Sequence, residues 1–479
     1  MSVSNVTVVK NMIWRYAERF LAQGVSFFVS LILVRLLTPE DYGTVALVTV
    51  LVGILDVFST RGFNQAIIQK KEVDDLDYST IFVANMGLES TLYIVIFAAA
   101  PFIAKFYNNI ELIALIRFIS IRILVTGFNA IQQAYVQRNM LYRKFFLSTL
   151  LGTLVSAFVG IWMALKGYGV WALAFQTVVN TFIDTFVLFL TIDWRPHLKF
   201  SFSRLKEMLH FGINMFVMAV FESIYNELRS LVIGKWYTSS DLAFYNKGKN
   251  IPELLINNIQ IAANNVFFAA LSREKNYEDV KKKMREYMGV MFYILAPMLL
   301  GIVTISNNLI QVLYTSKWME TRPYMILYCM IYLSWILQMP ILQAINSRGR
   351  VDITLKLTIL HRIIGIGILI LWISKGPVYI AVGALIADYM ITVIDILIAK
   401  KMFCYTIAEM GEDIGNTLFC VCISMGCVYM TGSMLDNIWL STILQVIVGI
   451  IAYILFSLLF KNKLFIVLEK ALLQKIKRK

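Results

Sequence analysis

The stretch RLLTPEDYG (residues 35–43) has a counterpart in KWYTSSDLA (residues 235–243), 200 positions later in a chain of 479 residues. Both begin with a basic residue followed by two apolar or aromatic ones, and both end in a small residue. Between these ends they share a threonine (Thr38 and Thr238) and an aspartate (Asp41 and Asp241). Each follows an apolar run long enough to cross a bilayer. The match predicts a chain built from two related halves.

The composition predicts that both halves lie in a membrane. The chain is 59% hydrophobic and 15% charged, whereas soluble domains are about 45–50% apolar and about 25% charged. The N-terminal apolar run has no small-residue cleavage site, so we expect a retained first span rather than a signal peptide.

Apolar runs of about 20 residues predict fourteen membrane-spanning helices and an all-α, polytopic fold. The expected spans are residues 16–36, 42–64, 79–101, 111–135, 145–166, 168–191, 208–234, 241–268, 286–307, 323–346, 354–374, 377–399, 414–435 and 438–460.

Basic residues orient these spans, because cytoplasmic loops of membrane proteins are enriched in lysine and arginine. With the N-terminus inside, 30 lysines and arginines fall on the inner side and 9 on the outer side. We therefore expect a multi-pass membrane protein with both termini cytoplasmic. The net charge of +14 then reflects topology and attraction to anionic lipid, and it requires no nucleic-acid partner.

Six spans separate the two matching turns, so the halves have the same orientation in the membrane. This predicts a parallel repeat about a pseudo-two-fold axis along the membrane normal, with a site between the halves. The expected parts are an N-terminal lobe of six helices (1–193), a cytoplasmic loop (194–207), a C-terminal lobe of six helices (208–400), two further helices (401–460) and a basic cytoplasmic tail (461–479).

Polar residues at helical spacing predict which spans face that site. They follow lines on the first two spans of each half and on spans 4 and 6. A charged group inside a span is costly and normally faces a bundle interior or a water-filled cavity. The lines run through Arg19, Gln23, Ser26 and Ser30; Thr49, Asp56 and Thr60, with Arg61 adjoining; Arg122, Thr126, Asn129 and Gln133; Asn180 and Asp184; Glu222, Asn226 and Arg229; and Asn246, Asn250, Glu253, Asn257 and Asn264.

Structural explanations compete with this interpretation. Any single Asn or Ser can simply join helices by hydrogen bonds. Glu222 with Arg229, and Asp56 with Arg61, can be buried ion pairs. Asp388 and Asp395 lie on span 12, away from the other lines, and structural pairing is the leading explanation for both. We interpret His361, beside Arg362, as a satisfied buried histidine.

Three long stretches carry a family resemblance. VRLLTPEDYGTVAL (34–47), GFNQAIIQKKEVDDLDYSTIFVANM (62–86) and LRSLVIGKWYTSSDLAFYNKGKNIPELL (228–255) resemble signature segments of bacterial polysaccharide exporters. These are the O-antigen and teichuronic-acid type flippases of the multidrug/oligosaccharidyl-lipid/polysaccharide superfamily. The resemblance is strongest over residues 10–350. It implies two six-helix lobes around a central cavity, with helices 13 and 14 peripheral.

The resemblance also implies a substrate and a mechanism. We expect alternating access that moves a lipid-linked oligosaccharide, of the undecaprenyl-diphosphate type, from the inner to the outer leaflet of the bacterial cytoplasmic membrane for cell-surface polysaccharide synthesis. Arginine suits a diphosphate through its planar fork of donors. The expected substrate-binding residues are Arg19, Arg61, Arg122, Arg229, Asn250 and Asn257, and those expected to balance charge or carry coupling ions are Asp56, Glu222, Glu253 and Asp184.

No cofactor and no metal site is expected, since the five cysteines show no zinc-type spacing and the chain has no P-loop. Coupling to protons or to sodium stays open, and the expected partners are the bilayer, a glycan polymerase and glycosyltransferases. The alternatives are a cation-coupled multidrug exporter of the same superfamily, a membrane-embedded glycan polymerase or ligase, and a scaffold for glycan enzymes. The enzyme alternative is disfavoured because no expected outer connection is long enough to carry catalytic groups.

Overall fold

The structure, a computed structural model, describes residues 21, 23–58, 67, 68, 70, 72–274 and 276–465. Within these ranges the regular elements are helices, without any strand, so the predicted all-α class is confirmed. The helices are Gln23–Leu36, α2 (Pro39–Val57), α4 (Asp75–Tyr107), α5 (Glu111–Ile119), α6 (Ile121–Arg138), α7 (Tyr142–Leu165), α8 (Val170–Thr191), α9 (Phe202–Trp236), α10 (Ser239–Leu271), α11 (Tyr277–Leu313), η2 (Ser316–Thr321), α12 (Arg322–Ser347), α13 (Val351–Trp372), α14 (Pro377–Phe403), α15 (Ile407–Ser433) and α16 (Ile438–Leu459).

Within the described residues, each of the fourteen expected spans overlaps helical structure; residues 16–20, 22 and 59–64 of the first two spans lie outside the described residues. In the described part of the chain, nine helices are long and apolar enough to cross a membrane: α4, α7, α8, α11, α12 with the preceding η2, and α13–α16. The span expected as one helix over 111–135 is instead two, α5 and α6, divided at Ser120. The Ser120 hydroxyl donates to the carbonyl of Arg117 at 3.2 Å, a type of bond that bends helices.

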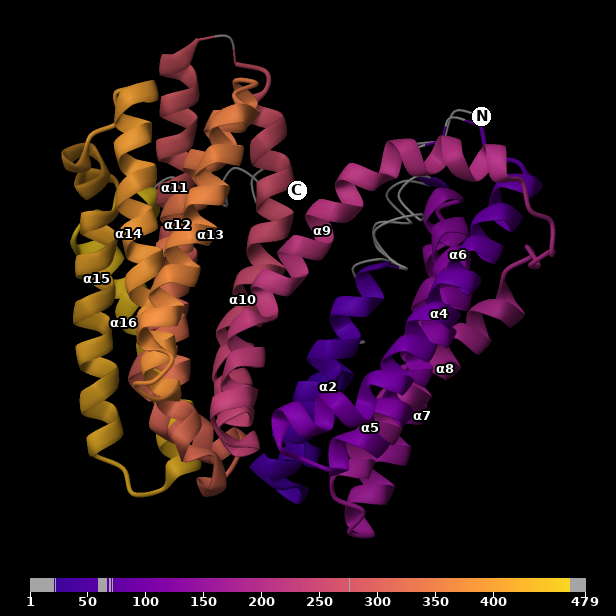
Figure 1. The fold of residues 1–479 in the computed structure, drawn as a ribbon. Helices are drawn as coiled ribbons and strands as arrows, with labels where there is room; N and C mark the ends of the chain where they lie inside the picture. The colour runs from indigo at the N-terminus through magenta and orange to yellow at the C-terminus, as the bar shows by residue number, and fades with distance from the viewer. Residues whose placement is uncertain are drawn as a thin grey trace. The chain divides into compact units, whose positions relative to one another are not determined.

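The helices form two compact units, Met1–Ala243 and Phe244–Lys479. Within the first unit, α7 packs against α8, α4 against α6, and α9 against both α2 and α4. Within the second unit, α11 packs against α12, α15 and α16, and α14 packs against α12 and α13; Figure 1 shows these helices standing side by side. The expected division into lobes at residues 194–207 stays a prediction.

The two matching turns have the same local structure. Thr38 caps α2: its backbone N–H and its hydroxyl donate to Asp41 Oδ2 at 2.9 and 2.7 Å, and the backbone N–H of Asp41 donates back to the Thr38 hydroxyl at 3.2 Å. Thr238 and Asp241 form the same three bonds before α10, at 3.0, 2.7 and 3.1 Å. Such reciprocal capping satisfies backbone donors that a helix start leaves unpaired. The repeated sequence pattern therefore encodes a repeated helix start.

The start of α2 and the turn between α9 and α10 approach each other closely within the first unit. A Cβ atom added to Gly43 would lie 1.6 Å from the carbonyl oxygen of Ser239, and one added to Gly234 would lie 2.9 Å from Leu47 Cδ1. The hydroxyl of Thr44 donates to that of Ser239 at 3.3 Å. Glycine is needed at position 43 because any side chain there would displace backbone.

The acidic N-cap and first turn of α4 hold the connection that leads into α9. Asp75 accepts a hydrogen bond from Trp194 Nε1 at 2.9 Å, and Arg204 lies 3.3 Å from Asp74 and 3.4 Å from Asp77. The hydrogen bond from the Asp77 backbone N–H, together with the nearby Arg204 guanidinium, lowers the pKa of Asp74. This segment therefore anchors the start of α9 to the first unit.

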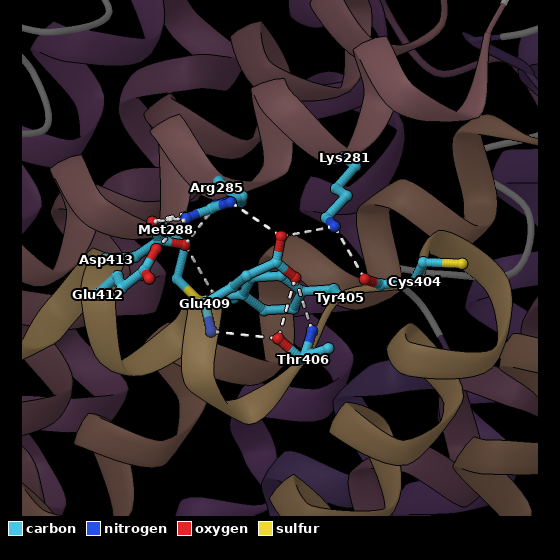
Figure 2. A network of polar contacts seen from close by, with 9 residues as sticks. All are labelled: Lys281, Arg285, Met288, Cys404, Tyr405, Thr406, Glu409, Glu412 and Asp413. Atoms are coloured by element: carbon cyan, nitrogen blue, oxygen red, sulfur yellow. Dashed lines mark hydrogen bonds and ion pairs between the residues drawn. The ribbon is translucent and has the colours of Figure 1, made fainter.

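Charged side chains also tie α15 to α11 in the second unit (Figure 2). Arg285 on α11 donates to both oxygens of Asp413, with Nε–Oδ2 and Nη2–Oδ1 distances of 2.8 Å, and to Glu409 Oε1 at 3.0 Å. Lys281 lies 2.7 Å from the same Glu409 oxygen and donates to the carbonyl of Cys404 at 2.8 Å. Two-bonded arginine–carboxylate contacts are among the stronger polar interactions in proteins. They fix α15 on the second unit.

The close approach at Gly43 predicts a difference between two glycines of α2. Gly43→Ala should destabilise the purified protein by about 1–3 kcal/mol, the usual cost of overpacking a tight contact. Gly53→Ala is the matched control, because a Cβ at Gly53 meets no atom within 4 Å and alanine favours the helix. Thermal unfolding in detergent measures both, and equal stability of the two variants would contradict the close approach.

Candidate functional site

A polar cavity of about 440 Å³ lies inside the first unit. Helix Gln23–Leu36, the first turns of α2 and α6, and the facing sides of α7 and α8 surround it. Its wall consists of Ser26, Val29, Ser30, Leu33, Tyr42, Arg122, Thr153, Ser156, Leu173, Gln176, Thr177, Asn180 and Thr181. Small hydroxyl and amide side chains dominate this list, which suits a hydrated space rather than an apolar core.

Arg122 is the charged group among the described residues of this wall. It begins α6, and its Nη2 donates to Asp56 Oδ2 near the end of α2. Asp56 is buried, and the Arg122 side chain is 24% exposed. An unpaired charge at this depth is costly. Each of the two residues therefore neutralises the charge of the other. The sequence predicted both as site residues, and the structure brings them together from positions 66 apart.

Asp184 belongs to the same polar region. It lies on α8, one turn beyond the wall residue Asn180, and accepts a hydrogen bond from Asn129 Nδ2 at 3.0 Å. Asn180 donates to the Ser156 hydroxyl at 3.2 Å. The polar lines expected on spans 4 and 6 therefore meet each other in the first unit.

The residues predicted on α9 are less enclosed. Glu222 is exposed, and Arg229 is half-buried with its guanidinium 5.8 Å from the ring centre of Tyr225. The ion pairs found among the described residues do not join Glu222 to Arg229. Mutual neutralisation of these two residues is therefore not the arrangement in this structure.

The residues predicted on α10 lie in the second unit. Asn250 and Asn257 are exposed, and Glu253 is half-buried with its carboxylate 3.8 Å from the ammonium of Lys249. Asn264, in the same polar line, accepts a hydrogen bond from the Tyr287 hydroxyl at 2.7 Å and so joins α10 to α11. Arg19 and Arg61 lie outside the described residues.

Sequence reasoning missed most of the α7 and α8 side of the cavity. Thr153, Ser156, Gln176, Thr177 and Thr181 line it, yet none was singled out. The available signal was spacing: Gln176 and Asn180, like Thr177 and Thr181, are four residues apart in an apolar helix and must share a face. Glu89 on α4 was also missed, although a carboxylate inside an expected span is itself a signal of a polar interior. Its side chain is fully buried.

Comparison with known proteins places this architecture among polysaccharide-related membrane proteins. A family model described as "Polysaccharide biosynthesis protein" matches residues 32–323. The chain is 22% identical to the lipopolysaccharide biosynthesis protein WzxC of Escherichia coli (strain K12), with 81% of this chain and 80% of the relative covered. It is also 22% identical to the succinoglycan biosynthesis transport protein ExoT of Rhizobium meliloti (strain 1021), with 67% and 65% covered.

Solved structures share the fold at low sequence identity. The lipid II flippase MurJ in an inward closed conformation matches with a TM-score of 0.79 and 16% identity, over 94% of this chain and 99% of that one. An inward-facing multidrug resistance transporter of the MATE family matches with a TM-score of 0.55 and 16% identity, over 84% and 95%. The chain thus shares its fold with these two proteins.

The Arg122–Asp56 contact predicts a non-additive pattern of stability. Arg122→Gln and Asp56→Asn should each destabilise the protein by about 3 kcal/mol, because each leaves one buried charge without its partner. The double variant should be more stable than either single variant, since no charge is then left uncompensated. Thermal unfolding of the three proteins gives the coupling, and strictly additive losses would show that the two groups do not neutralise one another.

Proposed function

Because the chain belongs to the polysaccharide biosynthesis protein family, we propose that it moves a lipid-linked oligosaccharide from the inner to the outer leaflet of the bacterial cytoplasmic membrane. The family match, which covers residues 32–323, is the observation that carries the proposal. The fold shared with a lipid II flippase supports it. The chain acts as a transporter rather than as an enzyme, and its working partners are the glycosyltransferases and the polymerase of the same glycan.

The substrate of such a flippase carries a diphosphate, which needs cations along its path. Arg122 and Arg229 are the described arginines in the polar lines, and both are only half-exposed. Arg122 donates to Asp56 through Nη2, so this carboxylate competes with a phosphate for the guanidinium. Protonation of Asp56, or its movement away, releases the guanidinium for the phosphate. The pair thereby limits the affinity for the anion and lets the substrate leave again.

Alternating access requires a contact that opens and closes. The turns that begin α2 and α10 have matching caps, and they pack together at Gly43 and Ser239. We place these turns at the outer side, following the distribution of basic residues. Their contact closes the outer end of the path, and export requires the contact to separate while each capped turn stays intact.

A cation-coupled multidrug exporter is the competing function. The MATE-family structures share the fold, but with a TM-score of 0.55 compared with 0.79 for the lipid II flippase. The charged residue in the described wall of the cavity is Arg122, whose remaining N–H groups beside the Asp56 contact can donate to phosphate but not to a cationic drug. The chemistry of the cavity therefore favours an anionic substrate.

Arg229 gives a direct test of the proposed path. Arg229→Gln should reduce glycan export at matched membrane levels by about tenfold, the effect of raising the barrier by about 1.4 kcal/mol. Arg229→Lys should recover part of the loss, because lysine keeps the charge but not the fork of donors. Export is measured as the amount of cell-surface glycan divided by the amount of protein inserted in the membrane, for each variant and for the natural protein.

The charge-matched control is Glu222→Gln, alone and combined with Arg229→Gln. If Arg229 serves the substrate, the double variant should remain as inactive as Arg229→Gln. Recovery of export in the double variant would instead assign both residues to a structural pair in a conformation other than the present one.

A further inference from the structure

His361 and Asp395 form a buried pair in the second unit that the proposed path does not use. His361 lies in the middle of α13 and Asp395 lies on α14, and their Nε2 and Oδ1 atoms are 3.2 Å apart. The Asp395 side chain is completely buried, and that of His361 is 16% exposed. The pair therefore connects two neighbouring helices through titratable groups inside the expected membrane region.

The carboxylate of Asp395 is incompletely satisfied. Within the described part of the chain, neither of its oxygens accepts a hydrogen bond of good geometry, and the same is true of His361 Nε2. The two groups thus face one another at ion-pair distance without an aligned bond. Buried polar groups are almost always hydrogen-bonded, so this pair needs a proton between its two members or a rearrangement that aligns them.

The surroundings of the pair are apolar. Leu357, one turn before His361, and Ile396 and Ala399, beside and one turn beyond Asp395, belong to one buried hydrophobic cluster. A lone carboxylate in such surroundings costs several kcal/mol. One proton removes this cost, because it leaves the pair neutral overall, as imidazolium with carboxylate or as imidazole with carboxylic acid.

The other charged groups near this region have partners of their own. The helices α11, α12 and α13 pack against α14, and His361 is the titratable group that they place against Asp395. Asp388, two turns earlier on α14, accepts a hydrogen bond from Trp335 Nε1 on α12 at 3.0 Å. Arg362, next to His361, has an interaction of its own. The net charge of the His361–Asp395 pair therefore depends on how many protons these two side chains carry.

We propose that His361 and Asp395 bind one proton between α13 and α14 and release it when these helices separate. A calcium or magnesium ion fits poorly, because these ions take six or more oxygen ligands, and the described residues contain no cluster of three metal-ligating side chains. We expect α13 to move against α14, because Ile359, Ile363 and Ile370 on the face opposite His361 are exposed and α13 packs mainly on α14 and α12. Opening the α13–α14 contact would admit water and let the proton leave.

This proposal deepens the proposed function by naming the coupling ion, and it rests on that function only for its link to export. Proton binding itself is tested without any substrate. Infrared difference spectra of the purified protein between about pH 5 and about pH 9 report carboxylic acid and imidazolium bands over the range in which histidine titrates. Asp395→Asn and His361→Gln should each change the same pH-dependent signal, because both groups share one proton.

Asp352→Asn is the matched control, since Asp352 is an exposed carboxylate at the start of α13 that pairs with Arg350. It should leave the pair's signal unchanged. If the spectra of Asp395→Asn and His361→Gln match that of the natural protein, the pair keeps its protonation state throughout and the proposal is wrong, even if both variants are less stable.

Export measured in cells with and without a protonophore gives the second readout. The variants Asp395→Asn and His361→Gln should lose about tenfold in export and should no longer respond to collapse of the proton gradient. If the infrared signal behaves as expected but the natural protein exports no glycan, the proposed function fails while the proton site stands. If export responds to the gradient equally in the variants and in the natural protein, the pair is not the coupling site.

Discussion

The need to neutralise every charge buried among apolar helices is the constraint on which the rest of this structure depends. Arg122 and Asp56 meet it by pairing across α2 and α6 beside the polar cavity. The proposed proton shared by His361 and Asp395, which lie 3.2 Å apart across α13 and α14, would meet it there. At helix ends the same rule appears as ion pairs that join elements, as in the contact of Arg285 with Asp413. A transporter gains from this constraint, because a pair that can open exposes a charge to its substrate or to a proton.

The internal repeat supplies matching helix starts for α2 and α10. Thr38 with Asp41 and Thr238 with Asp241 build the same capped turn in both halves, and Gly43 permits the two turns to touch. A capped helix start keeps its shape when its neighbours move, because its hydrogen bonds are local. Contacts between such turns, rather than the turns themselves, are therefore suited to open and close during transport.

The sequence predicted the all-α fold, the helical positions of the fourteen spans and the family, because these depend on the length and periodicity of apolar runs and on long local motifs. The break at Ser120 was missed, since serine fits a helix as well as a bend. The partner of Arg122 was not predicted either. Asp56 lies 66 positions away, and only the packing of α2 against α6 brings the two together. The pairing of His361 with Asp395, each interpreted as structural, was likewise not predicted, because their proximity depends on how α13 packs on α14.

The most direct test of the account is lipid movement by the purified protein. The protein would be reconstituted in liposomes that contain a fluorescent, diphosphate-linked oligosaccharide lipid, and the fraction of lipid exposed on the outer surface would be measured over time under an imposed proton gradient. We predict that the protein moves the lipid between leaflets and that Arg229→Gln slows this movement. Movement no faster than in protein-free liposomes, with either a proton or a sodium gradient, would contradict the account.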